Sequence, residues 1–498
     1  MSNFRHILKS NRWLLLIVLL SVLLKVILLL QGEIVNPDAA TYLAAAEKHS
    51  QGLFREGLYY YKMPLYPLLL AVTHFFIPDW IISGQLLTVL ALVAAIFPLY
   101  ALTLRLFDRD TALWTVLLFA VLPKFNTVKI MRDPLFLLFT LGALYFLVVF
   151  FHEKRLRLFA GFCLMAILAI FMRIEGILLF AVAAGSVFAP GWNLKRLVST
   201  KTFSIICLAL LLMVVILLRV DFAGLVTMLR LNEVVQWEKG LYSLDLFSGY
   251  RHMMEAIRQL QLALPGGHLR NNLLEVTRHY APLIYCIGLF EVLVVSVFPT
   301  SLLAFWAFRW RKKEKEKTFR WVILLSWVAF TIINVFFLLK ANFIQTRYFW
   351  IPIVLTLPWI GYGISLWWQE GANKKIIAPL VVLLIFIAPL SRTITAAMES
   401  DDMIIVDAGC WLRDNDPLKK IALFYNDRRL PLYSQRLSDV KRVRKLAYLR
   451  KFAKKNKNVA MVALYLSKRK NENYNIQGFE PVKIFEGNKK IVVVLGRQ

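Results

Sequence analysis

Long apolar runs separated by short polar links fill the chain up to about residue 398. A helix needs about 20 mostly apolar residues to cross the hydrocarbon core of a membrane, and many of these runs approach that length. We therefore expect an all-α polytopic membrane protein over residues 1–398, with about eleven membrane-spanning helices. They are expected near residues 13–30, 81–104, 111–123, 134–151, 156–171, 174–189, 203–218, 282–308, 321–339, 348–368 and 376–390.

A polar and aromatic loop, residues 31–80, follows the first of these helices and holds the strongest candidate for chemistry. Asn36, Pro37 and Asp38 are residue types that begin helices, and an alanine-rich run follows them. Residues four apart share one face of a helix, so Asp38 and Tyr42 should lie on the same side of a short helix in this loop.

The same loop continues with aromatic residues and a short apolar run. Tyr59, Tyr60 and Tyr61 suit the headgroup level of a membrane, and the adjacent Lys62 can face an anionic headgroup. The apolar run at 65–77 is shorter than a spanning helix, so we expect it to be re-entrant or to lie at the membrane interface.

Basic residues outnumber acidic ones by 60 to 31, which gives a formal net charge of +29. They cluster in the short links between apolar runs, a pattern typical of membrane orientation, so no nucleic-acid partner is expected. If the run at 65–77 does not cross, the strongest basic cluster, residues 309–320, lies on the inner side together with the amino terminus, as the positive-inside rule requires. The loop at 31–80 then lies outside.

From about residue 399 the composition changes to mixed polar sequence, which indicates a small soluble α/β domain over 399–498. Eleven crossings place this domain outside, and long domains translocate largely regardless of their charge. The expected elements are helices at 404–413 and 439–455, the second strongly basic, and strands at 420–425, 459–466, 481–485 and 490–495. Two interpretations of the second helix are open. Its basic face can rest on anionic headgroups, or the helix can pack on its own sheet with the basic face in solvent.

Cysteine and histidine give no metal site. The four cysteines, Cys163, Cys207, Cys286 and Cys410, are far apart, and the histidines show no ligand spacing. We therefore expect no cofactor, and the residues seen do not require a divalent metal, because lysine and arginine can supply the positive charge instead.

Polar residues gather in the links that should lie on the outer side. A buried carboxylate suits general-base work on a hydroxyl, while nearby arginine and lysine can hold a phosphate and stabilise a leaving group. Together these residue types indicate transfer of a group away from a phosphate. The candidates are Asp38, Lys62, Lys129, Arg132, Asp133, Arg173, Glu175, Arg347 and Tyr348.

Four of these candidates also have a structural interpretation. Arg173 and Glu175 can pair across a tight turn, and Arg347 can anchor the start of an apolar helix at the interface. Asp133 followed by Pro134 is also an ordinary helix start.

These residues resemble the GT-C glycosyltransferases, and within them the bacterial relatives of the dolichyl-phosphate-mannose protein mannosyltransferases and of the lipid A aminoarabinose transferase. The resemblance covers roughly residues 13–390. It is carried by Asp38 at the start of the first outer loop, Lys62-Met63-Pro64-Leu65-Tyr66, Met131-Arg132-Asp133-Pro134-Leu135-Phe136, Arg173-Ile174-Glu175-Gly176 and Arg347-Tyr348.

The resemblance implies a glycosyltransferase of the cell envelope that moves a hexose or pentose from a polyprenyl-phosphate donor to an acceptor hydroxyl on the outer face. Asp38 would be the general base and Asp133 a second catalytic acidic residue. Contacts to substrate would come from Lys62, Tyr42, Tyr61, Arg132, Arg173, Glu175, Arg347 and Tyr348. The expected location is the bacterial inner membrane, among membrane lipids, with the active site and carboxy-terminal domain extracytoplasmic.

Two departures leave the acceptor open among glycan, lipid and protein. Lys62-Met63-Pro64 replaces the usual histidine or lysine followed by two prolines, and Ala39 stands where protein mannosyltransferases have an acidic partner to the base. A transporter or flippase of lipid-linked sugars is the alternative. It would need the same basic and aromatic residues, but it would need no base at Asp38.

Overall fold

A computed structural model describes residues 12–31, 35–186, 247–263, 268–294, 317–342 and 345–371, single residues 387 and 391, and in the carboxy-terminal part 403–415, 422–425, 427, 429–434, 441–443, 450–452, 459–468 and 475–497. The chain forms two compact units. The bundle unit comprises Met1–Leu23, Ala91–Asn126 and Asp133–Ser391, and the loop unit comprises Leu24–Leu90, Thr127–Arg132 and Arg392–Gln498. Helices α2 (Arg12–Leu30) and α6 (Trp80–Leu106) contribute to both.

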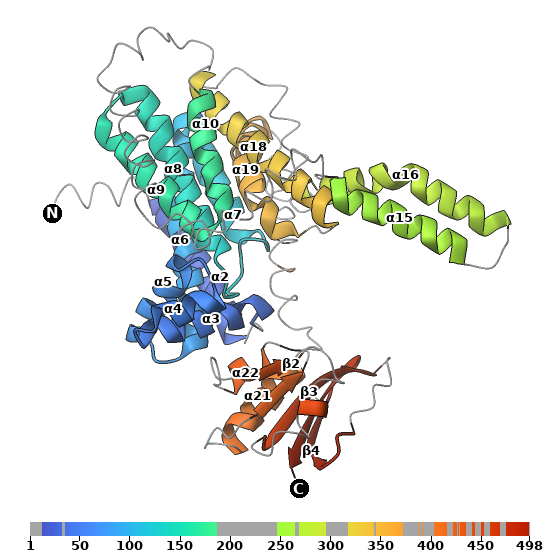
Figure 1. Cartoon of the computed structure of the whole chain (residues 1–498). Helices are drawn as coiled ribbons and strands as arrows, with labels where there is room; N and C mark the ends of the chain where they lie inside the picture. The colour runs from blue at the N-terminus through green and yellow to red at the C-terminus, as the bar shows by residue number, and fades with distance from the viewer. Residues whose placement is uncertain are drawn as a thin grey trace. The chain divides into compact units, whose positions relative to one another are not determined.

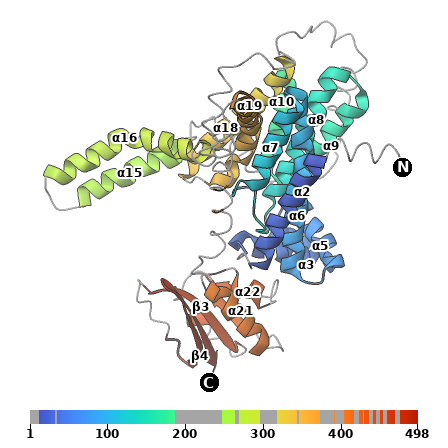
Figure 2. The same cartoon turned by 180° about the vertical axis from the view of Figure 1, so that it is seen from behind.

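The described part of the bundle unit consists of helices, most of which are apolar (Figure 1). Helix α8 packs beside α9, α7 beside α19, and α10 beside α18, and both views show these pairs (Figures 1 and 2). The elements are α7 (Arg109–Val121), α8 (Asp133–Glu153), α9 (Leu156–Met172), η1 (Ile174–Ile177), α10 (Leu178–Ser186), α15 (Ser248–Ala263), α16 (His268–Leu293), α18 (Lys317–Ala341), η5 (Thr346–Phe349) and α19 (Trp350–Gly371).

Five helices in the described part of the chain are long and apolar enough to cross a membrane: α2, α6, α8, α18 and α19. Shorter apolar helices occur at 156–172, 174–186 and 279–293, where spans were also expected. The expected span at 203–218 lies outside the described residues, as do most of 376–390 and the later part of 282–308.

Three short helices of the loop unit follow α2: α3 (Pro37–Ser50), α4 (Phe54–Tyr60) and α5 (Leu65–Phe76). Helix α5 has 12 residues, too few to span a membrane, in agreement with the sequence pattern. Its last residues, Phe75 and Phe76, are exposed.

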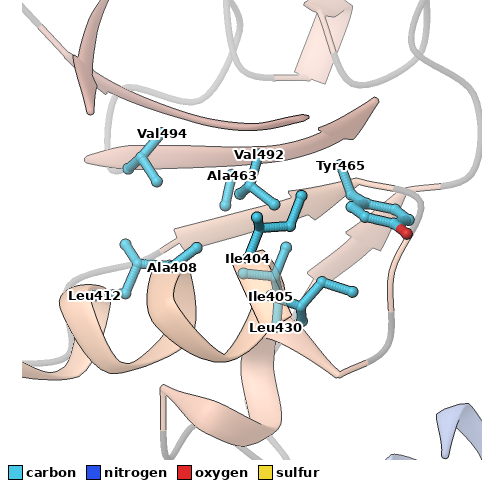
Figure 3. Close-up of a cluster of buried hydrophobic side chains, with 9 residues drawn as sticks. All are labelled: Ile404, Ile405, Ala408, Leu412, Leu430, Ala463, Tyr465, Val492 and Val494. Carbon is cyan, nitrogen blue, oxygen red and sulfur yellow. The ribbon is translucent and has the colours of Figure 1, made fainter. Parts of the chain in front are cut away.

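A five-stranded sheet forms the core of the carboxy-terminal part. Its order is β2-β1-β3-β5-β4, with β2, β1 and β3 parallel and the last two pairings antiparallel. Helix α21 (Met403–Asn415) and the short α22 (Leu430–Tyr433) cover one face. There Ile405, Ala408 and Leu412 pack against side chains of β3 and β5 (Figure 3). The strands are β1 (Ala422–Tyr425), β2 (Lys441–Val443), β3 (Met461–Ser467), β4 (Phe479–Glu486) and β5 (Lys490–Arg497).

One expected element of this part is wrong. The chain over Lys441–Val443 forms the strand β2, whereas a basic helix was expected over 439–455; of the described residues in this range, only 450–452 are helical. The reason is long-range pairing: β2 lies parallel to β1 at the edge of the sheet, and this pairing overrides the local helical pattern. Helix α22 was not predicted.

Close packing of α7 on α19 depends on Gly361. A Cβ atom at this position would lie 2.4 Å from the Thr115 hydroxyl oxygen and 2.9 Å from the backbone oxygen of Thr111. Small residues permit such an approach between helices in membranes, and overpacking typically costs about 1–3 kcal/mol. We expect Gly361→Ala to lower the thermal unfolding temperature of the purified protein. Gly288→Ala is the control, because no atom lies within 4 Å of its added Cβ, and equal stability of the two variants would contradict this account.

Candidate active site

Local sequence fixes the start of α3, where Asp38 lies. The Asn36 side chain accepts a hydrogen bond from the Ala39 backbone N–H at 3.2 Å, and Pro37 takes the first helical position. Asp38 is half-buried in the first turn, where the helix dipole favours a negative charge. Tyr42, one turn later on the same face, is buried.

Aromatic rings and an arginine surround Tyr42. Its ring makes edge-to-face contacts with Tyr61 and Tyr66, with centroids 4.8 and 5.0 Å apart. The Arg132 guanidinium donates to the Tyr61 hydroxyl and to the Met63 sulfur, and it lies over the Tyr61 ring. We call Tyr42, Tyr61, Met63, Tyr66 and Arg132 the loop cluster; like Asp38, all five belong to the loop unit.

Lys62 lies between Tyr61 and Met63 in the chain, and its side chain is exposed. Tyr61 and Lys62 form part of the link between α4 and α5. The Tyr61 ring contacts Tyr42, whereas the Lys62 side chain faces solvent. A flexible, exposed cation is suited to meeting a charged ligand as a point charge.

A second set of candidates meets in the bundle unit. Arg173 lies at the turn between α9 and η1 and is 5% exposed. Its guanidinium binds the Asp133 carboxylate at the start of α8 at 2.5 Å and the Glu175 carboxylate at 2.6 Å. Asp133 is 4% exposed, whereas Glu175 is half-buried. These three residues, with Phe136, Arg347 and Tyr348, form the arginine cluster.

Aromatic rings hold the same guanidinium. The Arg173 Cζ atom lies 4.8 Å from the Tyr348 ring centroid and 5.5 Å from that of Phe136, and Arg347 lies over the Tyr348 ring. The Asn334 side chain of α18 donates to the Tyr348 backbone oxygen at 2.8 Å, which fixes η5. Residues from α8, η1 and η5 therefore converge on one buried cation, and α18 holds η5 in place.

Burial by itself lowers the pKa of Arg173, but the Glu175 and Asp133 carboxylates outweigh it and raise the pKa above the ordinary value. The Arg173 guanidinium therefore stays charged, and its positive charge stabilises the two carboxylates that it binds. Arg173 and Glu175 therefore do form the ion pair across the turn that the sequence allowed, and Arg173 forms a second ion pair with Asp133.

The structure thus brings eight of the ten sequence candidates for catalysis or substrate contact together in two groups, and the other two, Asp38 and Lys62, belong to the same unit as the first group. Tyr42, Tyr61 and Arg132 meet in the loop cluster, and Asp133, Arg173, Glu175, Arg347 and Tyr348 meet in the arginine cluster. Sequence reasoning did not single out Met63, Tyr66 or Asn334. The first two lie in the Lys62–Tyr66 motif, which was a usable signal, whereas Asn334 lies within an apolar run and gave none.

The carboxy-terminal part reaches the loop that carries Asp38. The Val35 backbone N–H donates to the Tyr433 hydroxyl at 2.9 Å, and Val35 is buried. Both residues belong to the loop unit. Within the described ranges, no three His, Cys, Asp or Glu side chains are grouped to hold a metal ion.

Comparisons with known proteins agree with the family resemblance. Residues 62–218 match the family described as dolichyl-phosphate-mannose-protein mannosyltransferase, a range that includes Lys62, Arg132, Asp133, Arg173 and Glu175. No curated protein matches the chain in sequence.

Solved structures resemble the whole chain. ArnT from Cupriavidus metallidurans, solved with undecaprenyl phosphate bound, has a TM-score of 0.54 at 13% identity, over 97% of this chain and 98% of its own. An oligosaccharyltransferase from Archaeoglobus fulgidus, solved with Zn and sulfate, also has a TM-score of 0.54 at 13% identity, over 90% of this chain and 67% of its own. The chain therefore has a GT-C fold with apolar spanning helices and a small carboxy-terminal sheet, which confirms the expected fold class.

Proposed function

We propose that the protein is an integral-membrane glycosyltransferase that moves a sugar from a polyprenyl-phosphate donor to an acceptor hydroxyl on the outer face of the membrane. The observation that carries this proposal is that a half-buried acid, Asp38, begins the same helix, α3, that carries Tyr42 of the loop cluster, in which Arg132 holds the aromatic rings. The GT-C fold and the match of residues 62–218 support the reaction class.

In the proposed reaction the acceptor oxygen attacks the anomeric carbon of the donor sugar. The acceptor proton passes to the Asp38 carboxylate, and the bond between the anomeric carbon and the phosphate oxygen breaks with its electron pair leaving on polyprenyl phosphate. Attack opposite the leaving group inverts the anomeric configuration. A positioned carboxylate contributes roughly 10² to 10⁴-fold to such a step.

Positive charge for the leaving phosphate comes from Lys62 and Arg132 in this proposal. Lys62 is exposed and can reach a ligand, while Arg132 is already oriented by Tyr61 and Met63. Tyr42 and Tyr61 offer aromatic surface to the donor. Undecaprenyl phosphate bound to ArnT, which has the same fold, supports a donor of this chemical class.

The arginine cluster supplies a second acid, Asp133, which we propose as the other catalytic residue. The Arg173 guanidinium binds the carboxylates of both Asp133 and Glu175. In this proposal Arg173 therefore orients the Asp133 carboxylate and does not bind phosphate directly. Arg347 and Tyr348 remain proposed substrate contacts.

The contact between Val35 and Tyr433 supports the proposed topology. A hydrogen bond joins groups on one side of a membrane, so an even number of crossings must separate them. Eleven spans, of which one precedes Val35, leave ten between the two residues. The first loop and the carboxy-terminal domain would then lie on one side of the bacterial inner membrane, and the positive-inside rule makes that side extracytoplasmic in this proposal.

Lys62→Ala should weaken donor use more than Lys62→Arg does, because the proposed role needs a positive charge opposite a phosphate. We expect the KM for the polyprenyl-phosphate sugar to rise about tenfold in Lys62→Ala, since hydrogen bonds to charged groups contribute about 1.5–3 kcal/mol. Initial rates over a range of donor concentrations measure this. Lys483→Ala, which removes an exposed lysine of β4, is the control. Wild-type KM values in both Lys62 variants would remove this residue from the site.

A flippase of lipid-linked sugars is the alternative function. It needs phosphate-binding cations and interfacial aromatic residues, both present here, but it forms no glycosidic bond and needs no base. Movement of a lipid-linked sugar across proteoliposomes without any glycosidic product would favour it.

A further inference from the structure

The carboxy-terminal domain contacts the main chain directly before the helix that carries Asp38. The Tyr433 hydroxyl accepts the Val35 N–H at 2.9 Å. Val35 is 1% exposed and precedes Asn36, the residue that caps α3. A buried backbone N–H must be hydrogen-bonded, and here the partner comes from a residue 398 positions later in the chain.

Tyr433 is held in place by its own domain. It ends α22, where its backbone N–H donates to the Arg429 oxygen at 3.0 Å, and its side chain packs on the hydrophobic cluster between α21 and the sheet. Gly409 of α21 allows this approach, because a Cβ there would lie 2.3 Å from the Tyr433 Cβ. Arg429 is in turn fixed by a buried ion pair with Asp427 at 2.8 Å.

Burial raises the pKa of Tyr433 above its ordinary value, so its hydroxyl is neutral and keeps lone pairs for the Val35 N–H. On the other side of this bond, the Asn36 side chain caps the Ala39 N–H and Pro37 fixes the first helical backbone angle. The direction in which α3 begins is therefore set by its own cap and by a residue of the soluble domain.

We infer that Tyr433 is a positioning residue, through which the carboxy-terminal domain holds the start of α3 and so orients Asp38 for proton transfer. The inference rests on the proposed function, because it assigns a role to the domain in the same reaction. A misplacement of about 1 Å at a reacting group can reduce a rate by about 10²-fold, so the loss of one hydrogen bond at the start of α3 can lower the reaction rate. This gives the soluble domain a function besides any contact with the acceptor.

Tyr433→Phe tests the inference, since it removes one oxygen atom and keeps the ring in the hydrophobic cluster. Full-length protein in detergent should show faster amide hydrogen exchange in peptides that cover residues 35–43, by roughly three- to tenfold. Its kcat should fall about tenfold while the KM for the lipid-linked donor stays unchanged. Tyr465→Phe is the matched control, because Tyr465 packs in the same cluster (Figure 3), and it should match the wild type in exchange at 35–43 and in kcat.

Unchanged exchange in Tyr433→Phe would overturn the inference, and so would faster exchange with a wild-type kcat, because the contact would then not orient Asp38 for catalysis. An equal loss of kcat in Tyr465→Phe would overturn it as well, since any weakening of the domain would then have the same effect. Asp38→Asn is measured in parallel to separate the two proposals. If Asp38→Asn is inactive and Tyr433→Phe behaves like the wild type, the positioning role fails alone; if Asp38→Asn keeps its activity, the proposed base itself fails.

Discussion

Asp38→Asn should reduce sugar transfer by roughly 10² to 10⁴-fold, the contribution that a positioned general base typically makes. The amide keeps the shape of the carboxylate and its place in the first turn of α3, but it cannot accept the proton of the acceptor hydroxyl. Loss of charge near the helix start costs only about 0.3–1 kcal/mol, so insertion and folding should be preserved. The measurement is incorporation of sugar into envelope material by membranes that carry equal amounts of each variant.

Glu56→Gln provides the matched control for Asp38→Asn. Glu56 is also an acid in the first turn of a helix of the same unit, α4, but it is exposed and pairs with Lys48 at 3.6 Å. Its loss should leave transfer near the wild-type rate. Substantial transfer by Asp38→Asn, or an equal loss in both variants, would remove Asp38 as the base.

Arg173→Met should destabilise the bundle unit strongly. It leaves the Asp133 carboxylate, 4% exposed, without its cation, and removal of one partner of a buried ion pair typically costs about 3–5 kcal/mol. Thermal unfolding of the purified protein measures the effect. Arg258→Met is the control, because Arg258 is exposed and pairs with Glu255 on the surface of α15, where a pair contributes about 0–1 kcal/mol.

The double variant Arg173→Met with Asp133→Asn separates charge from packing. If an unpaired carboxylate causes the loss, the double variant should be more stable than the sum of the two single effects predicts. Strict additivity would show that the guanidinium stabilises the cluster through its contacts with Phe136 and Tyr348 instead. Wild-type stability of Arg173→Met would contradict the buried pair altogether.

Much of the fold could be predicted from hydrophobic pattern. The runs that became α6, α8, α18 and α19 were recognised by length, and the short run at 65–77 was recognised as α5 because a span needs more residues. The strand β2 was missed because its identity depends on pairing with β1, and a pattern of basic and apolar residues at local spacing carries no information on such a partner. The same applies to α22, which has only four residues.

The sequence also predicted the residues of the candidate site better than the contacts between them. Motifs identified Arg132, Asp133, Arg173 and Tyr348, because polar residues between apolar runs are conspicuous. Which of them would meet was not predictable. The sequence left open whether Arg173 holds a substrate or pairs with Glu175, and the distances show both Glu175 and Asp133 bound to it. The contact between Val35 and Tyr433 could not be foreseen, because neither residue type indicates a partner so distant in the chain.

Mass spectrometry of the cell envelope tests the central claim, sugar transfer from a lipid-linked donor, most directly. A host strain that lacks the protein is compared with the same strain carrying the wild type or Asp38→Asn. We predict that the deletion strain loses the mass of one sugar from an envelope glycan, lipid or protein and accumulates the polyprenyl-phosphate sugar. The wild type should restore that mass, and Asp38→Asn should not. Unchanged envelope sugars in the deletion strain, or full restoration by Asp38→Asn, would contradict the account.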